Sequence, residues 1–147
     1  PVFPPEDGAG LRAVGEACGI PLAAGENCCF ASQFAALFDA GAVQYAQPSV
    51  TKVGGITEFR KVAALCAARG IKLAPHSPYF GPGALATLHL IAALAGEEAR
   101  FEYFYLQVDA ALYGELLQPR RGELTVPQGP GLGADPDADV VRRYRTE

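Results

Sequence analysis

The 147-residue chain lacks several features that are typical of particular classes of protein. It contains no methionine, not even at its first position, so we expect it to be a piece of a longer polypeptide. Its longest apolar run, residues 84–95, is interrupted by Thr87 and His89 and is shorter than the roughly 18 residues that a membrane span needs. The first residues show neither the basic flank nor the apolar core of a signal peptide. We therefore expect no membrane partner.

Charge and cysteine content exclude further classes. The formal net charge of −4 offers no basic surface for nucleic acid, so we expect no nucleic-acid partner. The four cysteines show no C-x-x-C spacing, and the adjacent residues Cys28 and Cys29 are poorly placed to bridge to each other. We favour free, buried thiols in a reducing cytoplasm over a disulfide pair.

The chain does contain a repeated alternation of short apolar stretches and helix-length apolar patterns. Strands are predicted within residues 20–24, 43–47, 71–74 and 99–106. Helices are predicted over residues 10–18, 30–40 and 57–69, each followed by a glycine, and from residue 84 onward. Thr57 or its neighbour is expected to cap the third helix. Because no G-x-G-x-x-G motif follows a strand and the unit is about 25 residues long, the pattern favours a βα barrel over a Rossmann sheet.

A polar residue lies at or near the end of each apolar stretch, namely Glu26, Ser49, His76 and Glu102. The carboxyl ends of parallel strands meet at one edge of the sheet, where such folds place their chemistry. We therefore expect the side chains of Glu26, His76 and Glu102 to converge. The chain changes character after about residue 118, where Pro, Gly and Asp become frequent, and we expect an extended tail there.

Each of these residues has a functional and a structural interpretation. Glu26 could bind a hard cation such as Mg²⁺, or it could be a solvated or capping carboxylate. His76 could transfer protons near neutral pH, or it could be structural. Glu102, among aromatic residues, could remain neutral and donate a proton to an oxyanion, or it could be exposed or ion-paired. Lys52 could neutralise an anionic substrate, or it could be a surface lysine.

Taken together, these segments resemble the mandelate racemase/muconate lactonizing enzyme family of the enolase superfamily. The similar segments are, in chain order, residues 19–27, 47–58, 75–76, 101–103 and 129–133. The resemblance implies an α/β fold, the C-terminal half of a (β/α)7β TIM-like barrel in which parallel strands alternate with helices. Residues 1–117 would form about strands five to eight, and residues 118–147 would form a Pro/Gly-rich tail that packs on a capping domain absent from this chain.

The resemblance also implies roles for individual residues. Glu26 would be one of three carboxylates that hold Mg²⁺, with the other two, and a lysine base, upstream of this chain. His76 would act as a base or acid, and Glu102 would hydrogen-bond the substrate carboxylate as it becomes an enolate. Lys52 and Asn27 would support the metal and substrate site. The loop that begins at Tyr79 would shape the pocket for the distal end of the substrate.

Ser49 departs from the pattern of the family. The resemblance implies at this position either an aspartate that orients the histidine or a lysine base, and serine is neither. A lysine mechanism on this side is therefore not expected. His76 remains the candidate acid or base, and the Ser49 hydroxyl could hydrogen-bond its ring and fix its tautomer.

The function that the resemblance implies is proton abstraction alpha to a carboxylate, with dehydration of a sugar acid favoured. A racemase or epimerase of the same family, or a non-catalytic barrel that serves as a scaffold, is the alternative. The expected partners are a small carboxylate substrate, the missing N-terminal half and, for the full-length protein, a second copy in a homo-oligomer. We expect a cytoplasmic protein whose isolated C-terminal fragment is inactive.

Overall fold

The structure is a computed structural model that describes residue 4, residues 7–96 and residues 100–146. Its elements are, in chain order, α1 (Gly8–Cys18), β1 (Ala23–Ala24), α2 (Ala31–Asp39), β2 (Tyr45–Ala46), α3 (Ile56–Arg69), β3 (Lys72–Leu73), α4 (Pro82–Leu94), the 3-10 helix η2 (Gly114–Leu117) and α5 (Ala138–Tyr144). The predicted α/β alternation is confirmed. Among the described helices, none combines the length and apolar character that crossing a bilayer requires.

The strands form one parallel sheet in the order β1-β2-β3. The central strand pairs on both sides, with Ala46 opposite Ala24 on one side and opposite Leu73 on the other. Hydrogen bonding continues beyond the strands, because His76 N donates to Pro48 O at 3.2 Å. This register carries the three strand ends to the same edge of the sheet.

The strands are shorter than the apolar runs that predicted them, since each contains two residues. The predicted fourth strand is not formed within residues 100–106, and residue 99 lies outside the described residues. The backbone of this segment is attached to the end of β3 by the side chain of Ser77, whose hydroxyl accepts from Glu102 N at 2.9 Å. A side-chain contact of this kind leaves no alternation pattern in the sequence.

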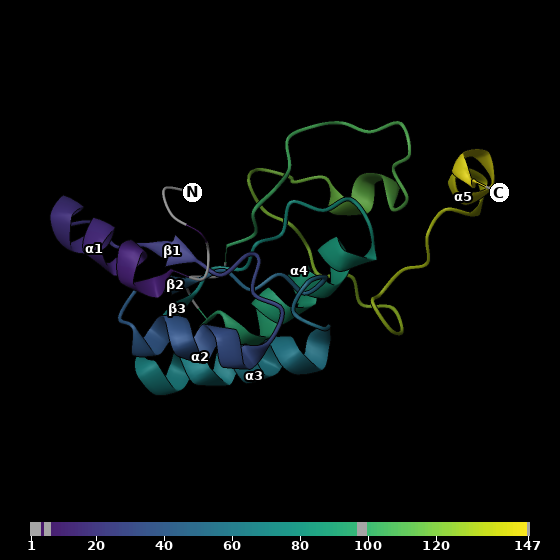
Figure 1. The fold of residues 1–147 in the computed structure, drawn as a ribbon. Helices are drawn as coiled ribbons and strands as arrows, with labels where there is room; N and C mark the ends of the chain where they lie inside the picture. The colour runs from purple at the N-terminus through teal and green to yellow at the C-terminus, as the bar shows by residue number, and fades with distance from the viewer. Residues whose placement is uncertain (1–3, 5–6, 97–99, 147) are drawn as a thin grey trace.

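Helices α2 and α3 run side by side along one face of the sheet, and α4 contacts α3 (Figure 1). Their predicted apolar stripes are confirmed. The buried side chains of these two helices are Phe34, Leu37 and Phe38 from α2, and Phe59, Val62 and Cys66 from α3. Burial of such side chains stabilises the fold by about 1.5–3 kcal/mol each, so this layer holds the short strands together.

Helix α3 begins differently from the prediction. Its N-cap is Gly55, with a φ of 93° and no side-chain cap, so the expected cap at Thr57 is wrong. The first-turn residue Glu58 instead makes contacts to two helices. Its carboxylate accepts from Lys61 Nζ of α3 at 2.8 Å, and it accepts from the backbone N–H of Ala31, the first residue of α2, at 3.0 Å. The Lys61 hydrogen bond first, and the Ala31 N–H second, lower the pKa of the Glu58 carboxyl.

The C-terminal segment is not extended throughout. Helix α5 is capped by Asp137, whose carboxylate accepts from Asp139 N at 2.8 Å and from Val140 N at 3.1 Å. Figure 1 shows α5 apart from the layer of α2 and α3. Earlier in the tail, Leu132 O lies 3.0 Å from His89 Nε2, so this part of the tail contacts α4.

No disulfide joins the four cysteines, all of which lie in described residues. Cys28 and Cys66 are buried, whereas Cys18 and Cys29 are exposed. The expectation that all four thiols are buried is therefore wrong for two of them. Cys18 is exposed because α1 has no buried residue in this chain.

Gly25 joins β1 to Glu26 at a point where no side chain fits. Its φ is +117°, and a Cβ built there would lie 2.3 Å from Cε1 of the buried Phe34 ring. We expect Gly25→Ala to lower the free energy of unfolding by about 3 kcal/mol, through overpacking and backbone strain.

A denaturant titration of the protein measures this loss. The matched control is Gly41→Ala, because Gly41 also has a positive φ, +64°, but no atom within 4 Å of an added Cβ. The control should lose about 1 kcal/mol. Equal losses for the two variants would show that contact with Phe34 does not restrict position 25.

Cys66 should give stability a measurable pH dependence. Burial raises the pKa of its thiol to about 11 from the usual 9.0. Because the folded protein then holds this proton more tightly than the unfolded chain, the contribution is present below about pH 9 and is lost as the pH rises toward 11. We expect the unfolding free energy of the wild type to fall more steeply in this window than that of Cys66→Ala. Cys29→Ala, which removes an exposed thiol, should keep the wild-type slope, and parallel curves for all three would contradict the prediction.

Candidate active site

Three of the predicted residues meet beyond the carboxyl ends of β1 and β3. Glu26 follows β1, His76 follows β3, and Glu102 comes from the segment that forms no strand. His76 Nδ1 lies 3.4 Å from Glu26 Oε2 and 3.1 Å from Glu102 Oε2. The structure therefore brings two carboxylates to one nitrogen of one imidazole.

This geometry selects a tautomer of His76. A nitrogen that faces two carboxylates is the one that carries a proton, because both carboxylates are acceptors. We assign the proton to Nδ1 on these contacts, so that Nε2 points away from the carboxylates. The side chain of His76 is 17% exposed, whereas those of Glu26 and Glu102 are 48% and 49% exposed. The ring is thus held in a mostly buried position with half-exposed acids beside it.

The surroundings of Glu102 differ from those expected from its aromatic neighbours. Its carboxylate is half exposed in this chain and has two donors on one oxygen, since Oε2 accepts from Ser77 N at 3.2 Å and faces His76 Nδ1. The proton-donating role expected of Glu102 stays a prediction.

Ser49 is fully buried, but it does not contact the imidazole in the way expected. Its hydroxyl hydrogen-bonds Thr51 Oγ1 at 3.0 Å and the hydroxyl of Tyr79. Tyr79 in turn presents its ring to His76, with centroids 6.0 Å apart and planes at 88°. Because these two partners take up the Ser49 hydroxyl, the side chain acts on the position of Tyr79 rather than on the imidazole nitrogen.

Lys52 and Asn27 form a second branch of the site. Lys52 Nζ donates to Asn27 Oδ1 at 2.9 Å, and Asn27 Nδ2 lies 3.5 Å from Glu26 Oε1. The lysine therefore reaches the carboxylate of Glu26 through an amide. This arrangement places a positive charge near the acids while leaving the Glu26 carboxylate half exposed.

The donor chemistry of Glu26 fits one position in the coordination shell of a hard cation. Mg²⁺ prefers carboxylate oxygens and keeps several other ligands. Within residues 4, 7–96 and 100–146, no group of three or more His, Cys, Asp or Glu side chains is arranged to hold a metal ion.

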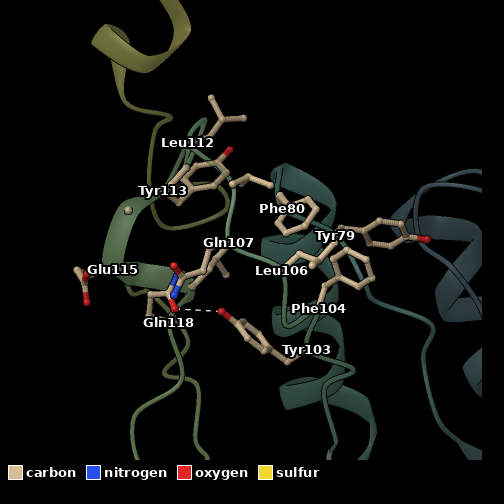
Figure 2. A pocket seen from close by; sticks show the side chains of 14 residues that line it. Tyr79, Phe80, Tyr103, Phe104, Leu106, Gln107, Leu112, Tyr113, Glu115 and Gln118 are labelled. Carbon is tan, nitrogen blue, oxygen red and sulfur yellow. Dashed lines mark hydrogen bonds between the residues drawn. The ribbon is translucent and has the colours of Figure 1, made fainter. Parts of the chain in front are cut away.

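A pocket of about 370 Å³ lies beside the site, and Tyr79 belongs to both (Figure 2). Tyr79 and Phe80 line it from the loop that precedes α4. Tyr103 and Gln118 line it from the C-terminal part of the chain, and the Tyr103 hydroxyl donates to Gln118 Oε1 at 3.0 Å, the dashed line in Figure 2. The pocket thus has an aromatic wall close to His76.

Sequence reasoning missed Ser77, which is fully buried and contacts Glu102 through both its backbone and its side chain. A serine after a histidine at a strand end is not a motif, and its partner lies 25 residues away in the chain. The signal that could have found it is its position between two candidate site residues.

Comparison with known proteins decides the family. Residues 1–140 match the family model described as enolase C-terminal domain-like. The chain belongs to this family. Membership confirms the resemblance to mandelate racemase and related proteins of the enolase superfamily, and the enolase C-terminal domain-like fold agrees with the parallel strands and helices described above.

Individual relatives make the comparison more specific. The chain is 36% identical over 138 residues to the D-galactonate dehydratase of Ralstonia pickettii (strain 12J), covering 83% of this chain and 34% of that protein. The solved structure of the 3,6-anhydro-D-galactonate cycloisomerase from Zobellia galactanivorans is 32% identical, with a TM-score of 0.81, over 99% of this chain and 41% of that one.

A third relative was solved with bound ligands. The L-talarate dehydratase from Polaromonas sp. JS666, complexed with Mg and L-glucarate, is 29% identical with a TM-score of 0.74 over 98% of this chain and 38% of that one. The chain spans about a third of the length of the curated relatives that it matches.

Proposed function

We propose that this chain is the C-terminal half of a (β/α)7β barrel in a Mg²⁺-dependent enzyme that dehydrates a sugar acid. The observation that carries the proposal is the placement of His76 Nδ1 within 3.4 Å of Glu26 and 3.1 Å of Glu102, at the carboxyl ends of parallel strands. In this proposal residues 1–117 contribute the last strands of the barrel. Residues 118–147 pack on a capping domain that the upstream part of the protein supplies.

The chemistry begins with a weakly acidic proton alpha to a carboxylate. The barrier to its removal is dominated by the negative charge that develops as the carboxylate becomes an enediolate. Glu26 would supply one ligand oxygen to Mg²⁺, and the bound ion would neutralise part of that charge as a Lewis acid. A base from the upstream half takes the alpha proton, and the C–H electron pair forms the carbon–carbon double bond of the enediolate.

His76 then acts as the acid. The enediolate electrons expel the hydroxyl on the beta carbon, and its C–O bond breaks with the electron pair on oxygen. For this step the ring carries a proton on each nitrogen. Nε2, the nitrogen that points away from the two carboxylates, delivers its proton to the departing oxygen so that water leaves, and the ring keeps the Nδ1 proton. The remaining enol becomes the 2-keto-3-deoxy acid. Glu102 uses Oε2 toward His76 and Ser77, which leaves Oε1 for the substrate. With a proton on Oε1, Glu102 would donate a hydrogen bond to the substrate carboxylate as it becomes the enediolate.

The second branch and the pocket bind the rest of the substrate. Lys52 supplies a positive charge that favours an anionic ligand, and Asn27 carries its effect to Glu26. The aromatic wall of Tyr79 and Phe80 suits the C–H faces of a polyhydroxy chain, while Gln118 offers polar contacts. Relatives named as dehydratases of D-galactonate, D-gluconate and D-xylonate support aldonic acids as the substrate class.

The first test of the proposal is His76→Asn in the full-length protein. The wild type should convert at least one of D-galactonate, D-gluconate and D-xylonate to the 2-keto-3-deoxy acid, and the variant should lose this activity by at least about 100-fold because the proton donor is gone. Exchange of the alpha proton in D₂O should persist in the variant, since the base is elsewhere.

The matched control is His89→Asn, which changes the chain's other histidine, on α4, and should keep wild-type turnover. Dehydration that survives His76→Asn would remove His76 from the mechanism. Exchange with inversion at the alpha carbon, without dehydration, would instead identify a racemase or epimerase. No exchange with any tested acid would favour a non-catalytic barrel.

Metal removal gives a second test. A chelator should abolish dehydration by the full-length protein, and Mg²⁺ should restore it. Glu26→Gln should weaken Mg²⁺ binding by at least about tenfold, because a carboxylate oxygen binds this ion better than an amide does. Glu16→Gln, which removes an exposed carboxylate paired with Arg12 on α1, is the control and should bind normally. Calorimetry of residues 1–147 alone should show no micromolar affinity, and tight binding by this fragment would contradict the need for upstream ligands.

A further inference from the structure

We infer that Ser77 is a positioning residue that holds Glu102 beside His76, and that this pair of acid and imidazole fixes the orientation of the catalytic ring. The inference rests on the proposed function of His76, which it deepens. Ser77 is fully buried, so it acts through Glu102 and does not contact the substrate.

Ser77 makes three hydrogen bonds to a single residue. Its backbone N–H donates to Glu102 Oε2 at 3.2 Å. Its hydroxyl accepts from Glu102 N at 2.9 Å and donates to Glu102 O at 3.3 Å. Backbone and side chain of Glu102 are thus held at once, by a group from which water is excluded. Buried hydrogen bonds of this kind are costly to lose, because no solvent replaces the missing partner.

Glu102 needs such an anchor because its own segment provides none. Residues 100–106 form no strand, so no backbone ladder fixes their register against β3. The side chain of Glu102 is half exposed. The three bonds from Ser77 therefore supply the alignment that brings Oε2 to 3.1 Å from His76 Nδ1.

Other groups near the imidazole do not replace this contact. The Ser49 hydroxyl is taken up by Thr51 and Tyr79. Glu26 lies farther from Nδ1, at 3.4 Å, and is the residue proposed to bind Mg²⁺. Glu102 is thus the carboxylate that remains to hold the Nδ1 proton and to keep Nε2 directed toward the substrate.

The test is Ser77→Ala in the full-length protein, which removes the hydroxyl with little change of volume. We expect kcat for the best sugar acid to fall by about 10- to 100-fold with a smaller change in KM, because misplacing a catalytic group by about 1 Å costs on this scale. Thr87→Val is the matched control. Thr87 is equally buried and its hydroxyl donates to Gly83 O at 2.8 Å within α4, so the variant should lose comparable thermal stability and keep its kcat.

A double-mutant cycle separates positioning from general destabilisation. If Ser77 acts through Glu102, then Ser77→Ala combined with Glu102→Gln should be no slower than Glu102→Gln alone. Multiplying effects of the two substitutions would overturn the inference, and so would a Ser77→Ala variant that turns over like the wild type.

A spectroscopic measurement keeps this inference distinct from the proposed function. The Nδ1 proton of His76, hydrogen-bonded to a carboxylate, should give a deshielded NMR signal in the full-length wild type and in Thr87→Val. The signal should be lost or shifted upfield in Ser77→Ala. A wild type that processes no sugar acid but shows this change would reject the proposed function and retain the positioning role. An unchanged signal in Ser77→Ala would reject the positioning role even in an active enzyme.

Discussion

The register of three very short parallel strands is the constraint on which the whole site depends. β2 pairs with both neighbours through Ala46, and the ladder continues to the bond between His76 N and Pro48 O. Side chains in a strand alternate between faces, so a slip of one residue would turn them to the other side. Glu26 and His76 meet only in this register. With so few ladder bonds, the packing of α2 and α3 on one face of the sheet must maintain it.

The sequence could predict the alternation of elements and the meeting of the strand ends, because both are local signals repeated along the chain. Apolar spacing located α2 and α3, and the glycines that end α1 and α3, Gly19 and Gly70, have the left-handed backbone conformation that a glycine cap predicts. The sequence could not predict how far the ladder extends, since strand length depends on neighbours distant in the chain. It also could not exclude a strand around Glu102. There the backbone N–H of Glu102 donates to the hydroxyl of Ser77 instead of to the backbone of a neighbouring strand.

Ser49 departs from the family pattern, and a residue elsewhere in the chain makes the contact to His76 that was expected at this position. From the sequence, the Ser49 hydroxyl was a candidate for the contact to the histidine. In the structure the hydroxyl of Ser49 holds the loop at Tyr79, and a carboxylate from another segment lies at His76 Nδ1. The chemical requirement, an acceptor for the Nδ1 proton, is met by a residue whose position no local pattern encodes.

Under the proposed function, the geometry around His76 also links metal binding to proton transfer. Two carboxylates close to one imidazole nitrogen repel each other, and a single Nδ1 proton satisfies them incompletely. Lys52 offsets this repulsion indirectly, because Asn27 stands between it and Glu26. A cation that engages Glu26 would relieve the repulsion and leave the Nδ1 proton to Glu102 alone. Since Glu102 is held by Ser77 and not by the metal, the imidazole would keep its orientation while the Glu26 carboxylate binds the ion. The separation of these two carboxylate roles is thus a consequence of where each side chain is anchored.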